Sequence, residues 1–226
     1  PSRPEVRDLL VRDYVSLSAI SGVKGVHLDY VRYSDIYLPV GLLPKYNLVQ
    51  DHEMPEFDYC YCNHCREGFS KRFGYDPMSQ PDPSADVQWH QYRLDLLVDV
   101  VRAVVAAVHQ AGSLITGAVF PTPEMSRSMV RQDWPRFGLD AYMPMLYHQF
   151  YLEPTDWIGD CIREIRAEIG DSPPVFAGIL NHPEVFTPDV LTRTFHQVRE
   201  AGGQGLAIFT AGSLTEEQAE VLHLTG

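Results

Sequence analysis

The stretch GVHLDYVRYSD, residues 25–35, begins as a buried strand and ends in residues that a buried strand does not favour. Its apolar start runs into Asp29, and Arg32 follows three residues later. His27 and Asp29 are two residues apart, so on a strand both side chains project from the same face. The stretch therefore predicts a strand that is buried for most of its length and presents polar groups at its carboxyl end.

The same apolar, strand-like pattern returns four more times, and helix-like segments separate the repeats. Continuous apolar strands alternating with helices are typical of a parallel sheet that is buried on both faces. Together with a leading helix expected at residues 2–20, five strand–helix units match an α/β fold, the (β/α)8 TIM barrel, without its first three strands. The chain would then cover roughly strands four to eight. The four further strands are expected at residues 113–120, 139–147, 173–180 and 204–210.

We expect residues 1–226 to form a single, partial TIM-barrel catalytic domain with a long Cys-containing insertion at about 34–86, after the first visible strand. The rival fold is an open, doubly wound sheet. That fold normally carries a Gly-rich phosphate turn, and no G-x-G-x-x-G motif follows any expected strand. The chain starts without Met and directly in a helix, which predicts a fragment of a longer protein or a trimmed chain.

Capping residues mark several helix starts. Ser2 with Glu5 has the S-x-x-E pattern of a capping box, and Thr215 with Gln218 has the related T-x-x-Q pattern. Thr155 is expected to cap another helix, and Thr187 precedes a proline in the N-cap/N1 arrangement. The clearest helix is expected at residues 87–111, where a long apolar stripe ends before Gly112.

The charge balance argues against two classes of partner. A formal net charge of −12 makes nucleic acids and anionic membranes poor partners, because both attract basic surfaces. No apolar run approaches the ~18 residues of a membrane span. With 45% hydrophobic residues the chain can bury a sizeable core, and its sequence defines no oligomeric state.

In a parallel α/β fold, functional side chains belong at the carboxyl ends of the strands. These ends are rich in aromatic, amide and carboxylate groups, and Arg32 is nearly their only cation. Aromatic rings beside carboxylates and amides suit neutral polyols such as sugars, whereas a phosphate site would need more positive charge. The predicted substrate-binding residues are His27, Tyr30, Arg32, Tyr147, His148 and Asn181. The alternative is that His27 is a satisfied interior residue and that the tyrosines pack at the rim.

Several segments together resemble the family 10-like glycoside hydrolases, which are bacterial TIM-barrel glycosidases. The resemblance keeps its order over almost the whole chain. It implies an O-glycosyl hydrolase acting on a poly- or oligosaccharide, with no cofactor required for catalysis. It also favours a secreted or periplasmic location, for which the sequence has no signal of its own. The segments are GVHLDYVRY (25–33), YCYCNHCREGF (59–69), FGYDP (73–77), AVFPTPE (118–124), LDAYMPMLY (139–147) and GLAIFT (205–210).

Glycoside hydrolysis needs two carboxyl groups flanking the scissile bond. Asp29 is the first candidate, and Arg32 would hold it ionised, since a nearby cation favours a carboxylate. Alternatively, Asp29 and Arg32 form a pair that only ties the loop to the barrel rim. Glu124 matches the family pattern after the next strand and is the second candidate. As an alternative, Glu124 stabilises the positive end of a helix. The rivals for the second role are Glu184, Asp58 and Glu56.

Cys60, Cys62 and Cys65 form a C-x-C-x-x-C motif that suits a structural zinc ion. The motif resembles a cysteine–zinc cluster of family 42 β-galactosidases, in which a further cysteine completes the site. Here no upstream cysteine is present in the chain, so His52 or His64 would substitute for it, or the partner lies in the missing part of a longer protein. A Cys60–Cys65 disulfide and free thiols remain the alternatives.

Two other functions stay open beside the hydrolase. The first is a barrel that binds carbohydrate without cleaving it, or a fragment too incomplete to act. The second is a metal-dependent hydrolase, which is disfavoured because the strand ends lack a His-x-His ligand set.

Overall fold

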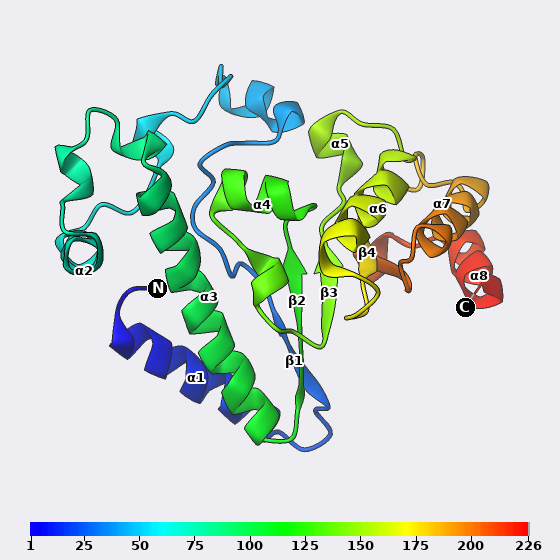
Figure 1. Cartoon of the computed structure of the whole chain (residues 1–226). Helices are drawn as coiled ribbons and strands as arrows, with labels where there is room; N and C mark the ends of the chain where they lie inside the picture. Colours follow the sequence, from blue (N-terminus) through cyan, green and yellow to red (C-terminus); the bar gives the residue numbers. More distant parts are fainter. Residues whose placement is uncertain (226) are drawn as a thin grey trace.

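The computed structural model describes residues 1–225. Long helices and short parallel strands alternate along the chain, and short helices fill the segment between the first strand and the longest helix (Figure 1). The elements before β2 are α1 (Pro4–Ser18), β1 (Gly25–Leu28), η1 (Val40–Tyr46), η2 (Pro55–Phe57), α2 (Asn63–Phe73), η3 (Pro77–Ser79), η4 (Pro83–Ala85) and α3 (Val87–Gln110). The others are β2 (Leu114–Val119), α4 (Pro123–Val130), η5 (Trp134–Arg136), β3 (Ala141–Pro144), α5 (His148–Tyr151), α6 (Trp157–Ile169), β4 (Phe176–Leu180), α7 (Pro188–Glu200), β5 (Gly205–Phe209), η6 (Ala211–Ser213) and α8 (Glu216–Thr225).

The strands form two small parallel sheets, one of three strands in the order β1-β2-β3 and one of two strands, β4-β5. Two isolated parallel bridges, Tyr142–Val175 and Met145–Gly178, connect β3 with the start and middle of β4. The strands therefore follow one another in chain order, and their carboxyl ends lie at the same edge.

The prediction of a (β/α)8 TIM barrel, of which the chain would supply roughly strands four to eight, is wrong, because the strands form two separate small sheets. Within residues 1–225 there are five strands in two sheets, and β1 and β5 do not pair with each other. The alternation of apolar strands and helices predicts that neighbouring strands pair in parallel, and the structure has such pairs. It carries no information on closure, because closure depends on pairing between the first and last strands of a ring.

The main hydrophobic core lies between the strands and the helices α3, α6 and α7. Val101 and Val108 of α3, Ile115 of β2 and Ile162 of α6 are all buried in it. Each such side chain contributes about 1.5–3 kcal/mol by leaving water. Across this layer, α1 packs on α3 at one side of the molecule, and α7 contacts both α6 and α8 at the other (Figure 1).

Two of the expected helix caps are present and two are not. Thr187 caps α7, and Thr215 and Gln218 hydrogen-bond reciprocally at the start of α8. By contrast, Arg3 is the N-cap of α1 without a side-chain bond, because the Ser2 hydroxyl lies 3.1 Å from the Cys65 sulfur instead. Helix α6 begins after Asp156, which likewise makes no capping bond.

The segment at residues 34–86, called the insertion below, contains no strand and has its own small core. Cys65 and Phe69 of α2 are buried there against Trp89 and Tyr92 at the start of α3. Deeper still, the Asp58 carboxylate is fully buried, with Arg93 Nη1 at 2.5 Å and Arg131 Nη2 at 3.2 Å.

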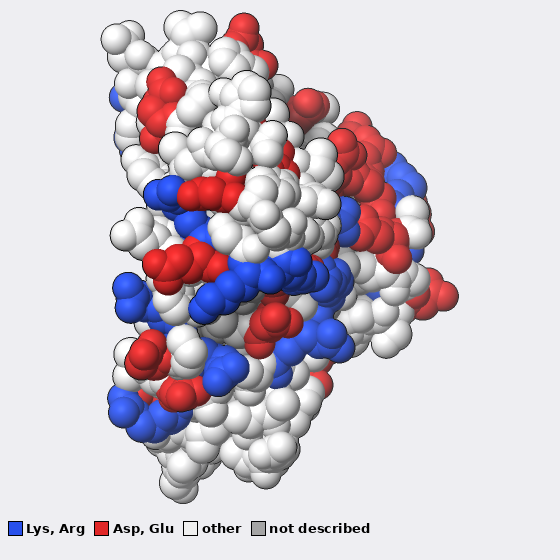
Figure 2. Space-filling view, turned by 60° about the vertical axis from the view of Figure 1, so that its left-hand side comes forward, with Lys and Arg blue, Asp and Glu red and all other residues white. Residues whose placement is uncertain are grey.

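Ion pairs also connect the helices at the surface. Arg136 lies 2.9 Å from Asp95 of α3 and 3.1 Å from Asp133, and Arg127 of α4 pairs with both Asp133 and Glu168 of α6. Figure 2 shows basic and acidic side chains interleaved over one face of the molecule. Of the helices in residues 1–225, none combines the length and apolar character needed to cross a membrane.

Candidate functional site

A cavity of about 610 Å³ opens at the carboxyl ends of the strands. All five strands contribute to it through the residues at or just after their ends, and η1 and α5 form the opposite wall. This is where a parallel α/β sheet normally binds its ligand. The residues contributed by the strand ends are Asp29 after β1, Phe120 after β2, Met145 and Tyr147 after β3, Leu180 of β4 and Phe209 of β5.

The wall formed by η1 depends on a glycine. A Cβ atom on Gly41 would lie 2.7 Å from the carbonyl oxygen of Phe150 and 2.8 Å from that of Gln149. Both distances are shorter than real Cβ contacts, so only glycine allows η1 to approach α5 this closely. The approach places Leu42 and Tyr46 of η1 over the cavity.

Asp29 lines the cavity immediately after β1. Its Oδ1 accepts a hydrogen bond of 2.8 Å from the backbone N–H of Tyr30, whose φ of +55° turns the chain sharply away from the strand. Within the described residues Asp29 forms no ion pair. Its carboxylate is exposed to the cavity and to solvent, so it is available to a ligand.

Arg32 is held by a different carboxylate from the one expected. Its Nη1 lies 3.2 Å from Oδ1 of Asp35 and donates to the Tyr33 carbonyl at 3.0 Å. The guanidinium carbon also lies 5.4 Å from the centre of the Tyr30 ring and 5.2 Å from that of Phe120, within cation–π range. The expected Asp29–Arg32 pair is therefore replaced by an Arg32–Asp35 pair, and Asp35 is a second carboxylate lining the cavity.

His27 lines the cavity from β1, and its Nδ1 lies 2.8 Å from the Thr116 hydroxyl on the neighbouring strand. The two residues are register partners in the sheet, which explains the contact. Partial burial lowers the pKa of His27, and the nearby Asp29 carboxylate opposes that shift. The imidazole is therefore neutral at pH 7 and can accept or donate one hydrogen bond toward a ligand.

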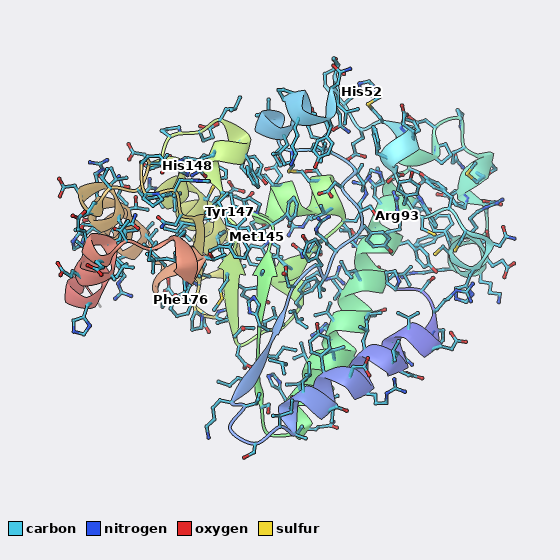
Figure 3. The ribbon with its side chains drawn as sticks, turned by 180° about the vertical axis from the view of Figure 1, so that it is seen from behind. His52, Arg93, Met145, Tyr147, His148 and Phe176 are labelled. Atoms are coloured by element: carbon cyan, nitrogen blue, oxygen red, sulfur yellow. The ribbon has the colours of Figure 1, made fainter. Side chains whose placement is uncertain are left out.

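Aromatic rings surround these polar groups. The Tyr147 ring lies 6.2 Å from Phe209 and 5.8 Å, edge to face, from Phe150. Burial, followed by the Asp29 charge, raises the pKa of Tyr147 to about 12, so its hydroxyl keeps its proton as a donor. Figure 3 shows Met145 and Tyr147 close together near the ends of the strands.

Gln132 is a cavity residue that the sequence did not suggest. It is almost fully buried, accepts from the Phe120 N–H at 2.9 Å and donates to the Val31 carbonyl at 2.8 Å. It thereby joins the segments that follow β1 and β2. Gln132 begins the QDW segment (132–134), which belongs to the family resemblance, but nothing in that segment assigns Gln132 a role in the site. Asp35 ends the opening stretch, at the start of the insertion, where no strand periodicity predicts the direction of its side chain.

Of the predicted catalytic and substrate-binding residues, three lie outside the cavity lining. Glu124 is exposed in the first turn of α4. His148 is buried with its ring edge-on to Phe186, and burial lowers its pKa. Asn181 is buried, and its side chain bonds to Ser213 and to Gln218 of α8. The geometry gives Asn181 an anchoring contact to the last helix.

The rivals for the second carboxylate also lie outside the cavity lining. Glu56 and Glu184 are exposed, and Asp58 is fully buried between Arg93 and Arg131. Figure 3 places Arg93 on the opposite side of the view from His148, on α3. Asp58 thus holds the insertion against α3 and the end of α4.

The three motif cysteines come together at the start of α2. Their sulfur atoms all lie within 4.8 Å of one another, and those of Cys62 and Cys65 are 3.5 Å apart. The expected histidine partners have other contacts. His64 Nε2 lies 2.9 Å from the Ser2 carbonyl, and His52 is exposed beside Asp51 at the outer edge of the insertion (Figure 3).

No family model matches the chain, and no curated protein matches its sequence. Among solved structures, the glycoside hydrolase domain of PgaB (BpsB) from Bordetella bronchiseptica superposes with a TM-score of 0.68 at 13% identity. The match covers 100% of this chain and 62% of that one, so the chain spans less than two thirds of the structure it resembles. At this identity the likeness shows that the chain shares the fold of that domain, and it gives no support to the family 10-like enzymes in particular.

Proposed function

We propose that the chain is a glycoside hydrolase that cleaves O-glycosidic bonds in a poly- or oligosaccharide, with Asp29 as a catalytic carboxylate. The observation that carries the proposal is the cavity at the strand ends, where carboxylates without a surplus of cations meet several aromatic rings. The likeness in fold to a glycoside hydrolase domain supports the same class.

The lining fits the chemistry of a sugar. The apolar face of a pyranose ring packs on aromatic side chains, and its hydroxyls bind carboxylates, amides and guanidinium groups. In this proposal Tyr30 and Tyr147 contact the ring, while His27 and Arg32 bind hydroxyls. Asp29, which has no cationic partner among the described residues, acts at the anomeric carbon as the nucleophile or as the base for water.

The second carboxyl group is Asp35 in this proposal, because it lines the same cavity as Asp29. Glu124, which the sequence favoured, is exposed on α4 outside that lining. The two assignments make opposite predictions for single substitutions, so one experiment separates them.

The experiment measures the release of reducing ends from a panel of polysaccharides. Asp29→Asn should lower the rate by about 100- to 10,000-fold, the usual contribution of a general acid or base. Asp35→Asn should also lower it strongly, and Glu124→Gln should leave it near the wild-type rate. Asp160→Asn, on the exposed face of α6, is the matched control. An active protein whose rate is unchanged by Asp29→Asn would refute the assignment.

One observation favours a second candidate function, a carbohydrate-binding protein without hydrolytic activity. Arg32 engages Asp35, which leaves Asp29 as the one cavity carboxylate among the described residues without an ion pair. In that case calorimetry would detect oligosaccharide binding by the wild type with no cleavage. Tyr147→Ala would then weaken binding, whereas Asp29→Asn would change it little.

A further inference from the structure

The three clustered sulfur atoms have a spacing that a metal ion explains better than a disulfide does. In a tetrahedral zinc site with Zn–S bonds of about 2.3 Å, the sulfur atoms lie ~3.8 Å apart. The sulfurs of Cys60, Cys62 and Cys65 lie within 4.8 Å of one another, and all three cysteines are free. A disulfide would use two of them and leave the presence of the third unexplained.

The local backbone produces this arrangement. Cys62 is the N-cap of α2 and Cys65 lies in its first turn, so the two residues are three apart and face the same side. The N–H of Cys62 donates to the Cys60 sulfur at 3.4 Å, which folds the C-x-C segment back over the helix start. The positive end of the helix dipole favours the thiolate form that a metal requires.

The surroundings of the sulfurs differ on their two sides. On one side, Cys65 is buried with Phe69, Trp89 and Tyr92 in the small core of the insertion. On the other side lies the start of the chain, where the Ser2 hydroxyl is 3.1 Å from the Cys65 sulfur. None of the three cysteines lines the cavity at the strand ends, so an ion here is remote from the proposed reaction.

We propose that Cys60, Cys62 and Cys65 bind one zinc ion, and that this ion fastens the insertion to the N-terminal segment. The Ser2 hydroxyl donates a hydrogen bond to the bound Cys65 thiolate and thereby connects residues 1–3 to α2. A core with four buried residues supplies little free energy by itself, and small units of this kind are commonly stabilised by a metal.

The first test is metal content. The reduced chain is loaded with zinc sulfate, separated from excess metal and measured by elemental mass spectrometry, with about one zinc per chain expected. Cys62 is exposed, so Cys62→Ser should fold and yet lose the zinc. Cys161→Ala is the matched control, because Cys161 is a buried thiol in α6, outside the cluster, and this variant should keep the zinc.

The second test reports the ligands. Cobalt(II) bound in place of zinc should give the visible bands of a tetrahedral thiolate complex in the wild type and in Cys161→Ala, but not in Cys62→Ser. Ser2→Ala should retain one ion but bind it about 10- to 100-fold more weakly in competition with a chromogenic chelator, as is typical when a hydrogen bond to a metal ligand is lost.

Three results would overturn the proposal. Wild type holding no more zinc than Cys62→Ser would exclude the site. An intact mass lower by two hydrogens in protein purified without reductant, together with no metal, would show a disulfide. Ser2→Ala with unchanged affinity would remove the link to the N-terminal segment. Because these measurements need no substrate, their outcome does not depend on whether the hydrolase proposal is correct.

Discussion

The strand–helix framework and the insertion at residues 34–86 are held together by different forces. In the framework, apolar side chains fill a large core between parallel strands and long helices. The insertion shares a core of four buried residues with the start of α3, and its buried carboxylate Asp58 contacts two buried arginines of the framework. We therefore expect the regular layer to tolerate small losses of volume and the small irregular unit to depend on a few directional contacts.

The largest expected effect is the loss of the buried carboxylate from the insertion. Asp58→Ala leaves Arg93 and Arg131 buried without a shared partner, which should lower the free energy of unfolding by about 3–5 kcal/mol. Urea denaturation followed by tryptophan fluorescence measures it, because Trp89 lies in the core beside this network. Asp8→Ala, on the exposed face of α1, should stay within about 0.5 kcal/mol. A loss below about 1 kcal/mol for Asp58→Ala would contradict the importance of this network.

A conservative change in the framework should cost less. Ile115→Val removes one methylene from a fully buried position on β2 and should lower the free energy of unfolding by about 0.5–1.5 kcal/mol. Fluorescence and far-ultraviolet circular dichroism should shift together, because the framework unfolds as one layer. Separate transitions in this variant would argue against a single framework core.

Surface ion pairs should matter least among the charged contacts. Arg136→Gln removes pairs with Asp95 and Asp133, but the Arg136 side chain is 43% exposed, so the loss should be about 0.2–1 kcal/mol. The difference from wild type should shrink between about 0.05 M and about 1 M NaCl, since salt screens exposed charges. Urea denaturation at the two salt concentrations checks this, and a salt-independent loss would contradict it.

A small pH dependence should come from His148. Burial, and then His182, lowers the pKa of His148 in the folded state, so below pH ~6.5 the unfolded chain binds protons more readily. The contribution of His148 to the free energy of unfolding is therefore complete above pH ~6.5. It is lost as the pH falls toward the pKa of His148 in the folded state. Urea melts at about pH 7.5 and about pH 5.5 should show a smaller decrease for His148→Gln than for wild type. An equal decrease in both proteins would assign the pH dependence to other groups.

Local signals in the sequence predicted the fold well where a few neighbouring residues decide it. Thr187 and the Thr215–Gln218 pair begin helices as expected, and the five strands lie within their predicted segments. Ser2 did not cap α1, because its hydroxyl contacts Cys65, sixty-three residues away. The prediction of a barrel was wrong for the same kind of reason, because no local sequence pattern indicates which distant strands pair.

The candidate site was predictable only in part. Asp29, His27, Tyr30, Arg32 and Tyr147 all line the cavity, because each follows or ends a strand at the shared edge. The pairing inside the site was not predictable. Arg32 and Asp35 are three residues apart in an irregular loop, and no regular spacing indicates that Arg32 turns to Asp35 instead of Asp29.

Gly41 allows η1 to contact α5, and this contact brings the insertion over the cavity. The cavity is therefore lined by two parts of the chain, the framework and the insertion. Asp29 comes from the framework, whereas Leu38, Leu42 and Tyr46 over it come from the insertion. A mutant library restricted to residues 38–46, with Gly41 kept, would therefore vary the shape of the binding space while leaving Asp29 on the framework and Asp35 outside the varied stretch. The protein thus offers directed evolution a starting point in which the residues over the cavity can be varied without changing Asp29 or Asp35.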